Sequence, residues 1–232
     1  MILSLNYFYF FFLRIFVINR NKLRFIAFQD VFRDYTIFST NEVEKVFPGF
    51  DRKVLVAWQK KGYIQKIRNN WYRFAKRPLH DEDLFFIANK IYHPSYVSLE
   101  SAFSYYQFIP EGVFRTTSIS TLKTAHFDTP AGYFQYRNMK PSLFWGYRLI
   151  RQRENPLSGW HKIASAEKAV IDFLYLNPQY EEEADFEGLR FNWEAFSTRV
   201  DLEKMGRYLK YIQSPALSNR MKNFLNVFHA QP

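Results

Sequence analysis

The residues best suited to chemistry lie in one short stretch that is rich in basic side chains. Between Arg52 and Arg77 the chain carries nine lysines and arginines and no aspartate or glutamate. They are Arg52, Lys53, Lys60, Lys61, Lys66, Arg68, Arg73, Lys76 and Arg77. Basic side chains gathered without intervening acids neutralise the phosphates of nucleic acids, although such a run is also compatible with a solvated surface. The stretch therefore predicts a polyanion-binding surface.

The net charge of the whole chain has the same origin. The 232 residues include 32 Lys+Arg and 22 Asp+Glu, a formal charge of +10. Residues 1–80 hold 15 basic and 5 acidic residues, whereas residues 81–232 hold 17 of each. A basic first third joined to a neutral remainder is typical of a nucleic-acid-binding module followed by a second domain.

Several other chemistries are excluded or disfavoured. The chain has no cysteine, which excludes disulfides, thiolate zinc sites and thiol catalysis. It has no glycine-rich phosphate loop and no nucleophile elbow. The five histidines have no metal-ligand spacing; they are His80, His93, His126, His161 and His229. We therefore expect no cofactor and no metal site.

A nuclease site is also disfavoured. A Mg²⁺-dependent nuclease of the PD-(D/E)xK kind needs two acids and a lysine, but Asp128 is followed by Gln135-Tyr136-Arg137 where the second acid and the lysine should stand. Glu167 and Lys168 are expected to form a helix cap or a surface pair, and Asp172 a structural hydrogen bond. The sequence predicts a protein that is not an enzyme and has no catalytic residues.

The elements around the basic stretch follow the order of a winged helix-turn-helix. Helices are expected over Leu23–Asp34, over Asn41–Phe47 after a Ser39-Thr40 cap, and over Arg52–Lys61 between Asp51 and Gly62. Two short strands, Tyr63–Ile67 and Trp71–Ala75, flank an Arg68-Asn69-Asn70 turn. Asparagine tolerates the left-handed backbone that a tight hairpin requires, so this pair is predicted to be the wing.

The third predicted helix has two faces. Val54, Leu55, Ala57 and Trp58 are expected to point inward, while Arg52, Lys53, Val56, Gln59 and Lys60 form the outer stripe. A recognition helix enters the major groove, where basic side chains reach guanine and Gln59 could pair with adenine. The predicted DNA-binding residues are Arg52, Lys53, Gln59, Lys60, Lys61, Lys66, Arg68, Asn69, Asn70 and Arg73.

Residues 81–232 are predicted to form an α+β domain with a small central sheet and a helical C-terminal tail. Its helices are expected over Asp81–Tyr92, Ser98–Tyr106, Ala164–Leu176, Trp193–Arg199, Leu202–Ile212 and Ala216–His229, and its strands over Val113–Ile119, Tyr133–Met139 and Phe144–Ile150. Phe103, Phe134, Tyr136, Phe144 and Phe173 are expected in the core, and not in base stacking. The acidic run Glu181–Glu187 is expected to be solvated, with contact to a basic partner as the alternative.

The domain boundaries follow from these elements. Residues 1–22 form an aromatic extension, residues 23–80 the winged helix-turn-helix domain, and residues 81–232 the second domain. The apolar run Met1–Ile18 is interrupted by Asn6 and Arg14, which disfavours a membrane span, and it lacks the flanks of a secretory signal. We expect a cytoplasmic protein.

Three motifs of the second domain carry a family resemblance. They are YHPSYVSLESAFSYYQFIPE (Tyr92–Glu111), the segment from TTSIS to FDTPAGYFQYRNMKPSLFWGYRLI (Thr116–Ile150), and IASAEKAVIDFLYL (Ile163–Leu176). In this order and spacing they resemble the AbiEi family, and Asp51–Ala75 resembles its winged-helix block. These proteins are antitoxins and transcriptional regulators of prokaryotic type IV toxin–antitoxin systems, which act in abortive infection and phage defence.

The resemblance implies a two-part protein. The winged helix would bind double-stranded DNA at its own operator and repress the operon, and the second domain would neutralise a nucleotidyltransferase-like toxin encoded nearby. Two features depart from the family pattern: Asn69-Asn70 replaces the usual glycine of the wing, and Met1–Ile18 is additional. The alternative is a stand-alone winged-helix regulator whose second domain senses a ligand or dimerises.

Overall fold

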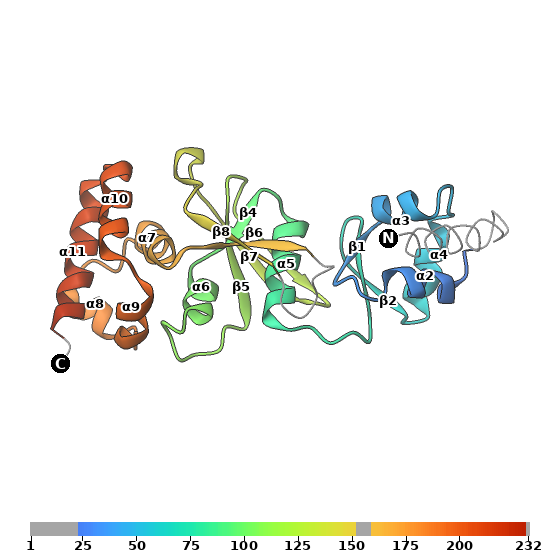
Figure 1. The fold of residues 1–232 in the computed structure, drawn as a ribbon, viewed down its shortest axis with the longest axis horizontal. Helices are drawn as coiled ribbons and strands as arrows, with labels where there is room; N and C mark the ends of the chain where they lie inside the picture. Colours follow the sequence, from blue (N-terminus) through green and yellow to red (C-terminus); the bar gives the residue numbers. More distant parts are fainter. Residues whose placement is uncertain (1–22, 152–158, 231–232) are drawn as a thin grey trace, which may run out of the picture. The chain divides into compact units, whose positions relative to one another are not determined.

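A computed structural model describes residues 23–151 and 159–230. The predicted N-terminal extension therefore lies outside the described residues. Within them the chain divides into two compact units, one ending at Leu79 and the other beginning at His80. The fold is mixed α/β, with a three-stranded sheet in the first unit and a six-stranded sheet in the second. Each unit is described by itself (Figure 1).

From residue 23 to residue 79, the described part of the first unit, the chain forms three short helices and three short strands. They are α2 Phe25–Phe32, β1 Phe38–Ser39, α3 Thr40–Val46, α4 Lys53–Lys60, β2 Ile64–Arg68 and β3 Trp71–Phe74. The strands form an antiparallel sheet in the order β1-β3-β2. The three helices and the hairpin expected from the sequence are therefore present, each within two residues or so of its predicted ends, and β1 is additional.

Aromatic rings fill the core of the first unit. Phe28 lies at its centre, with its ring centroid 4.9 Å from that of Phe32, 5.0 Å from that of Phe38 and 4.8 Å from that of Trp58. All four side chains are buried. Large rings bury much apolar area per residue, which explains how a unit of fewer than 60 described residues obtains a core.

Helix α3 begins at a complete capping box. The Ser39 hydroxyl accepts a hydrogen bond from the Glu42 amide at 3.2 Å, and the Glu42 carboxylate accepts one from the Ser39 amide at 2.6 Å. Both backbone groups would otherwise lack an intrahelical partner. The cap expected at Ser39-Thr40 is confirmed and belongs to Ser39.

Ser39→Ala is expected to lower the free energy of unfolding by about 1 kcal/mol, because the Glu42 amide loses its acceptor. Urea unfolding followed by circular dichroism measures the change. The matched control is Ser197→Ala, an exposed serine that caps no helix, which should change stability by less than about 0.5 kcal/mol. Equal stability of the two variants would contradict a role for the cap.

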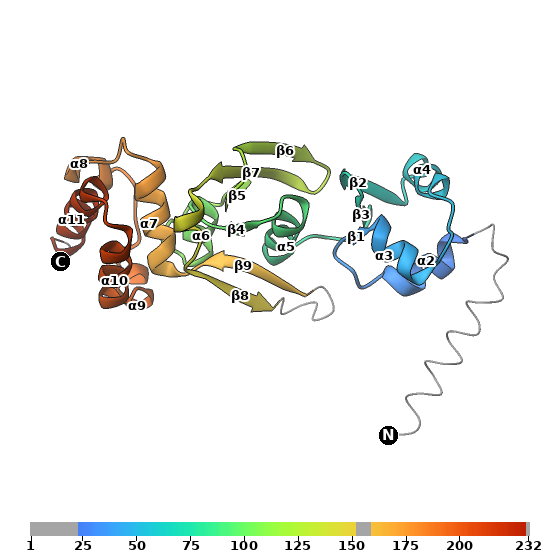
Figure 2. The same cartoon turned by 90° about the horizontal axis from the view of Figure 1, so that it is seen from above.

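The second unit is built on a mixed sheet of six strands in the order β6-β7-β5-β4-β9-β8, as seen in Figure 2. The strands are β4 Ser95–Val97, β5 Arg115–Ser120, β6 Ala125–Thr129, β7 Gly132–Asn138, β8 Tyr147–Arg151 and β9 Trp160–Ala164. The pairs β5–β7 and β4–β9 are parallel, and the others are antiparallel. The sheet is larger than expected, because β4, β6 and β9 were not predicted.

The helices of the second unit largely follow the sequence pattern. They are α5 Asp81–Ile91, α6 Glu100–Tyr105, α7 Ala166–Leu176, α8 Glu183–Glu187, α9 Trp193–Arg199, α10 Leu202–Ile212 and α11 Pro215–His229, with a 3-10 turn over Pro141–Leu143. Ser165 caps α7, as expected. Helices α8 to α11 form the helical tail, on the far side of α7 from the sheet (Figures 1 and 2).

The aromatic residues expected in the core are mostly found there. Phe103, Phe134, Tyr136 and Phe173 are buried, whereas Phe144 is half-buried in the segment that precedes β8. In the acidic run, the glutamates are exposed and Phe186 is buried against α11 through Phe224, with ring centroids 5.5 Å apart. These exposed glutamates agree with the solvated interpretation, and contact with a basic partner stays the untested alternative.

Candidate nucleic-acid interface

Helix α4 presents a basic outer face. Arg52 and Lys53 at its start and Lys60 at its end are exposed, while Leu55 and Trp58 are buried against the aromatic core. The helix is positioned at both ends: the Asp51 carboxylate accepts from the Lys53 amide at 2.9 Å. At the other end, Gly62 takes a positive φ of 69°, which ends the helix and starts the hairpin.

The predicted faces of α4 need one correction. Ala57, expected to point inward, is exposed, and Val54 is only half-buried. The eight residues of α4 meet the core along one narrow stripe, Leu55 and Trp58, so a position one residue before Trp58 already lies outside the contact. Val56, on the predicted outer stripe, is exposed as expected.

Two predicted base-reading positions differ in availability. Lys61 is exposed directly after the helix. Gln59 is half-buried, and its side-chain amide donates to the Leu55 carbonyl at 3.2 Å. Gln59 would have to break this bond to pair with adenine.

The β2–β3 hairpin adds a second set of polar side chains. Lys66, Asn69 and Asn70 are exposed, and Arg68 is half-buried. Asn70 has a φ of 65°, the left-handed conformation that the turn was expected to require. Asparagine adopts this conformation more readily than most residues, so it serves where a glycine is common.

Arg73 does not belong to the exposed set. Its side chain is 7% exposed, and its guanidinium donates to the carbonyl of Arg77, whose own guanidinium donates to the carbonyl of Asp34 at 3.3 Å. Burial and this hydrogen bond leave Arg73 little surface for a phosphate in this conformation, so it is not counted among the exposed basic residues.

Five basic residues remain as an exposed set, which we call the basic face: Arg52, Lys53, Lys60, Lys61 and Lys66. In the part of the chain that the structure describes, none of the five forms an ion pair with an acidic side chain. Their charges are therefore free to attract phosphates, and the sequence expectation for these positions agrees with their exposure.

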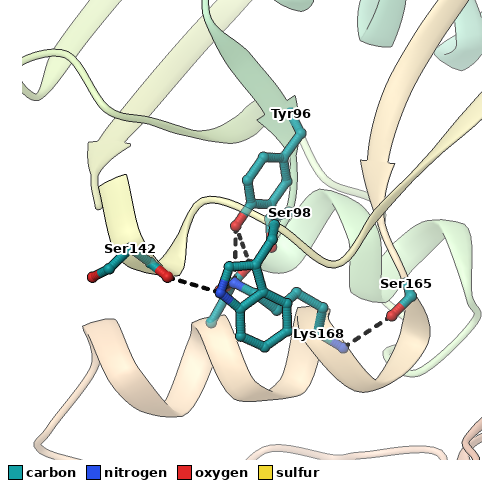
Figure 3. A network of polar contacts seen from close by, with 7 residues as sticks. Tyr96, Ser98, Ser142, Ser165 and Lys168 are labelled. Atoms are coloured by element: carbon teal, nitrogen blue, oxygen red, sulfur yellow. Dashed lines mark hydrogen bonds and ion pairs between the residues drawn. The ribbon is translucent and has the colours of Figure 1, made fainter. Parts of the chain in front are cut away.

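The second unit contains a buried polar network around Lys168, which the sequence predicts in a helix cap or a surface pair, and Asp172, which it predicts in a structural hydrogen bond. Lys168 and Asp172, one turn apart on α7, form an ion pair in which both side chains are 1% exposed. The Asp172 carboxylate also accepts from the hydroxyls of Tyr96 and Ser98, each at 2.9 Å, and the Lys168 ammonium donates to the Tyr96 hydroxyl at 3.0 Å (Figure 3). Expecting Lys168 at the surface was wrong, whereas Asp172 is a structural hydrogen-bonding group as expected.

Two aromatic rings pack against the Lys168 ammonium of this network. The Lys168 ammonium lies 5.2 Å from the ring centroid of Trp145 and 5.5 Å from that of Tyr96. Gly146 makes this approach possible, since a Cβ there would lie 3.0 Å from Lys168 side-chain carbons. Burial, together with the neighbouring Asp172 carboxylate, raises the pKa of Tyr96 well above its usual value, so the phenol stays a donor. Burial also raises the pKa of Asp172, against the lowering effect of Lys168.

Glu167 links α7 to α10 and is also buried, at 4% exposure. Its carboxylate accepts from the Lys204 ammonium at 2.8 Å and from the Asp201 amide at 3.2 Å. Burial alone would raise the pKa of Glu167, but the hydrogen bonds from Lys204 and Ser165 lower it below its usual value. Glu167 therefore accepts a hydrogen bond from the N-cap residue of α10. The expectation that Glu167 lies at the surface is wrong.

His161 on β9 is fully buried, and neither ring nitrogen has a hydrogen-bond partner among the described residues. Its ring centroid lies 5.8 Å from that of Phe85. Burial lowers the pKa of His161 below 6.5, although the Glu82 carboxylate opposes this shift. Folding therefore favours the neutral imidazole.

Unfolding is expected to become easier as the pH falls below 6.5, because unfolded chains then protonate His161 while folded chains do not. The loss reaches at most about 1.4 kcal/mol per pH unit. Urea unfolding between about pH 5 and 7.5 should show this loss in the natural chain but a weaker one in His161→Leu. The exposed His126→Leu is the control and should keep the full dependence; the same slope in all three proteins would contradict the assignment.

Neither a metal centre nor a membrane span is found in residues 23–151 and 159–230. No group of three or more potential metal ligands is gathered there. No helix among these residues is both long enough and apolar enough to cross a bilayer. Comparison with protein-family models and with curated proteins finds no match to this chain. The resemblance to the AbiEi family therefore rests on its sequence motifs.

Proposed function

We propose that this protein is a DNA-binding transcriptional regulator that also acts as the antitoxin of an AbiEi-type toxin–antitoxin pair. It acts by binding and not by catalysis. In this proposal the first unit contacts double-stranded DNA at its own operator, and the second unit counteracts a nucleotidyltransferase-like toxin. The two halves rest on different support and are tested separately.

The proposal treats the first unit as a winged helix. The element order α2-β1-α3-α4-β2-β3 is compatible with that fold, with α4 as the recognition helix and the β2–β3 hairpin as the wing. Most of the acid-free basic stretch falls on this helix and hairpin, and six of its cations are exposed, the five of the basic face and Lys76. This overlap is the main support for the DNA-binding part of the proposal. A surface with many basic side chains and no acidic ones between them attracts phosphates.

The DNA-binding half predicts a strong salt dependence. The logarithm of the binding constant should fall linearly with the logarithm of salt concentration, with a slope of about −0.9 for each phosphate neutralised, hence about −4.5 for five contacts. Fluorescence anisotropy with the labelled duplex upstream of the gene measures the slope. A random duplex of equal length serves as the control for sequence preference. Binding without salt dependence would contradict the proposed surface.

The antitoxin half is tested by co-expression. If the neighbouring reading frame encodes a nucleotidyltransferase-like toxin, co-expressing this chain should restore growth of the host. A chain with charge reversals in the basic face should still restore growth, because neutralisation belongs to the second unit. Failure of the intact chain to restore growth would overturn this half while leaving DNA binding untouched.

A second candidate is a regulator without a toxin partner whose second unit binds a ligand. One observation favours it: a cavity of about 400 Å³ opens on the second unit, within the usual size range of small-molecule sites. Gene neighbourhood separates the candidates, because an AbiEi-type antitoxin is encoded next to its toxin.

A further inference from the structure

The cavity of the second unit lies at the beginning of two parallel strands. Arg115 on β5 is in register with Tyr133 on β7, and Thr117 is in register with Gln135. In-register neighbours share one face of a sheet, so these four side chains form the strand-borne part of the cavity lining. Glu100 at the start of α6 adds a carboxylate to the cavity lining, and Phe114 before β5 adds an aromatic ring.

Two rings at the cavity are unusually exposed. Phe114 is 96% exposed and Tyr133 is 57% exposed, whereas most aromatic residues of this unit are packed in its core. They are not among the residues whose spacing predicts core packing. Exposed rings beside a cavity offer flat apolar faces on which a planar ligand can stack.

Two charged groups line the cavity, the Glu100 carboxylate as an acceptor and the Arg115 guanidinium as a donor. Among the described residues the half-buried Glu100 carboxylate has no hydrogen bond or ion pair. The Arg115 guanidinium donates one hydrogen bond, to the Gln135 side-chain oxygen at 2.8 Å, and keeps its remaining N–H groups for a ligand. The Thr117 hydroxyl is already used, since it donates to the Ser98 carbonyl at 2.7 Å and accepts from the Ser101 amide at 3.0 Å.

These groups select a neutral planar ligand with both donors and acceptors. A cationic group would meet Arg115 and an anionic group would meet Glu100, so the part of the ligand that enters the cavity is neutral, and a phosphate attached to it stays outside the cavity. Guanine offers N1–H and N2–H donors side by side for one carboxylate, and O6 and N7 acceptors for a guanidinium. Adenine and cytosine each bring an amino donor without an adjacent N–H, so they fill only part of the pattern.

We propose that this cavity binds a guanine base, stacked on Tyr133 and Phe114 and held by Glu100 and Arg115. The base could belong to a free nucleotide or to a single-stranded nucleic acid, and the chemistry at the cavity is the same for both. The site is separate from the basic face and does not depend on duplex DNA binding.

The test uses the full-length chain carrying Lys53→Glu and Lys60→Glu, which removes competition from the basic face. Isothermal titration calorimetry with GMP, AMP and CMP tests the free nucleotide. Single-stranded pentanucleotides that differ only in a central guanine or adenine test the nucleic acid. We expect preference for guanine by about tenfold in at least one of the two arms.

Single substitutions then assign the contacts. Glu100→Gln and Tyr133→Ala should each weaken guanine binding by about tenfold, and Glu100→Gln should also reduce the preference over adenine. The matched controls are Glu187→Gln and Tyr211→Ala, an exposed glutamate and an exposed tyrosine outside the cavity, which should bind like the parent.

Every outcome bears on the proposal. Binding of GMP and of the guanine pentanucleotide supports a nucleotide site, and binding of the pentanucleotide alone supports a single strand as the source. Absence of binding in both arms, equal affinity for all bases, or unchanged affinity in Glu100→Gln overturns it. None of these results changes the duplex-binding test of the basic face, so the two fail independently.

Discussion

Asp172→Ala is expected to lower the free energy of unfolding of the second unit by about 3–5 kcal/mol, because it leaves the Lys168 ammonium buried without a counter-charge. The hydroxyls of Tyr96 and Ser98 lose their common acceptor in the same variant. Leaving buried polar groups unsatisfied adds to the cost. Urea unfolding of the full chain, followed by tryptophan fluorescence and circular dichroism, measures the change.

A double variant distinguishes loss of the pair from loss of packing. Lys168→Met with Asp172→Leu removes both charges and keeps apolar volume, so it should recover the part of the stability that Asp172→Ala loses through the unpaired ammonium, while the Tyr96 and Ser98 hydroxyls stay without their acceptor. Asp128→Ala, at an exposed position on β6, is the single-site control and should change stability by less than about 0.5 kcal/mol. An Asp172→Ala variant as stable as this control would contradict the importance of the buried pair.

Lys53→Glu combined with Lys60→Glu is expected to weaken duplex binding by more than about 100-fold. Two phosphate contacts are lost, each worth about tenfold if it contributes about 1.4 kcal/mol, and two like-charge repulsions are added. The log–log salt slope should become shallower by about 2. Both lysines are exposed on α4 and have no ion pair among the described residues, so folding should be unaffected.

The matched control reverses two exposed lysines of the second unit. Lys123→Glu with Lys140→Glu makes the same change in net charge outside the basic face. Under the proposal this variant keeps most of its duplex affinity, because neither lysine belongs to the basic face that contacts the phosphates. If both double variants lost affinity equally, total charge and not the α4 face would govern binding.

Local signals in the sequence were sufficient for most helices. The bounds of α9 and α10 agree with the predicted ranges Trp193–Arg199 and Leu202–Ile212, and Ser39 and Ser165 cap the helices that follow them. Capping and a 3.6-residue apolar period depend on neighbours in the chain, so a single sequence carries them. The hairpin turn at Asn69-Asn70 was predictable for the same reason.

Strands were harder to predict where the local sequence lacks an alternating pattern and pairing with neighbouring strands stabilises the extended conformation. β4 has only three residues and β9 includes His161 and Lys162, so neither has a clear alternating pattern. Both lie inside the six-stranded order, and pairing with distant segments, not local propensity, makes them strands.

By itself the sequence determined the acid-free basic stretch, the positions of most helices and the capping residues Ser39 and Ser165, because charge and capping are properties of neighbours along the chain. Tertiary structure alone decided which polar residues are buried. Arg73 is buried with its guanidinium bonded to the Arg77 carbonyl, and Lys168 is buried because Tyr96, Trp145 and Asp172 meet around it. The same closure of distant strands brought Glu100, Arg115 and Tyr133 to one cavity. Burial depends on which segments meet, and spacing along the chain does not encode it.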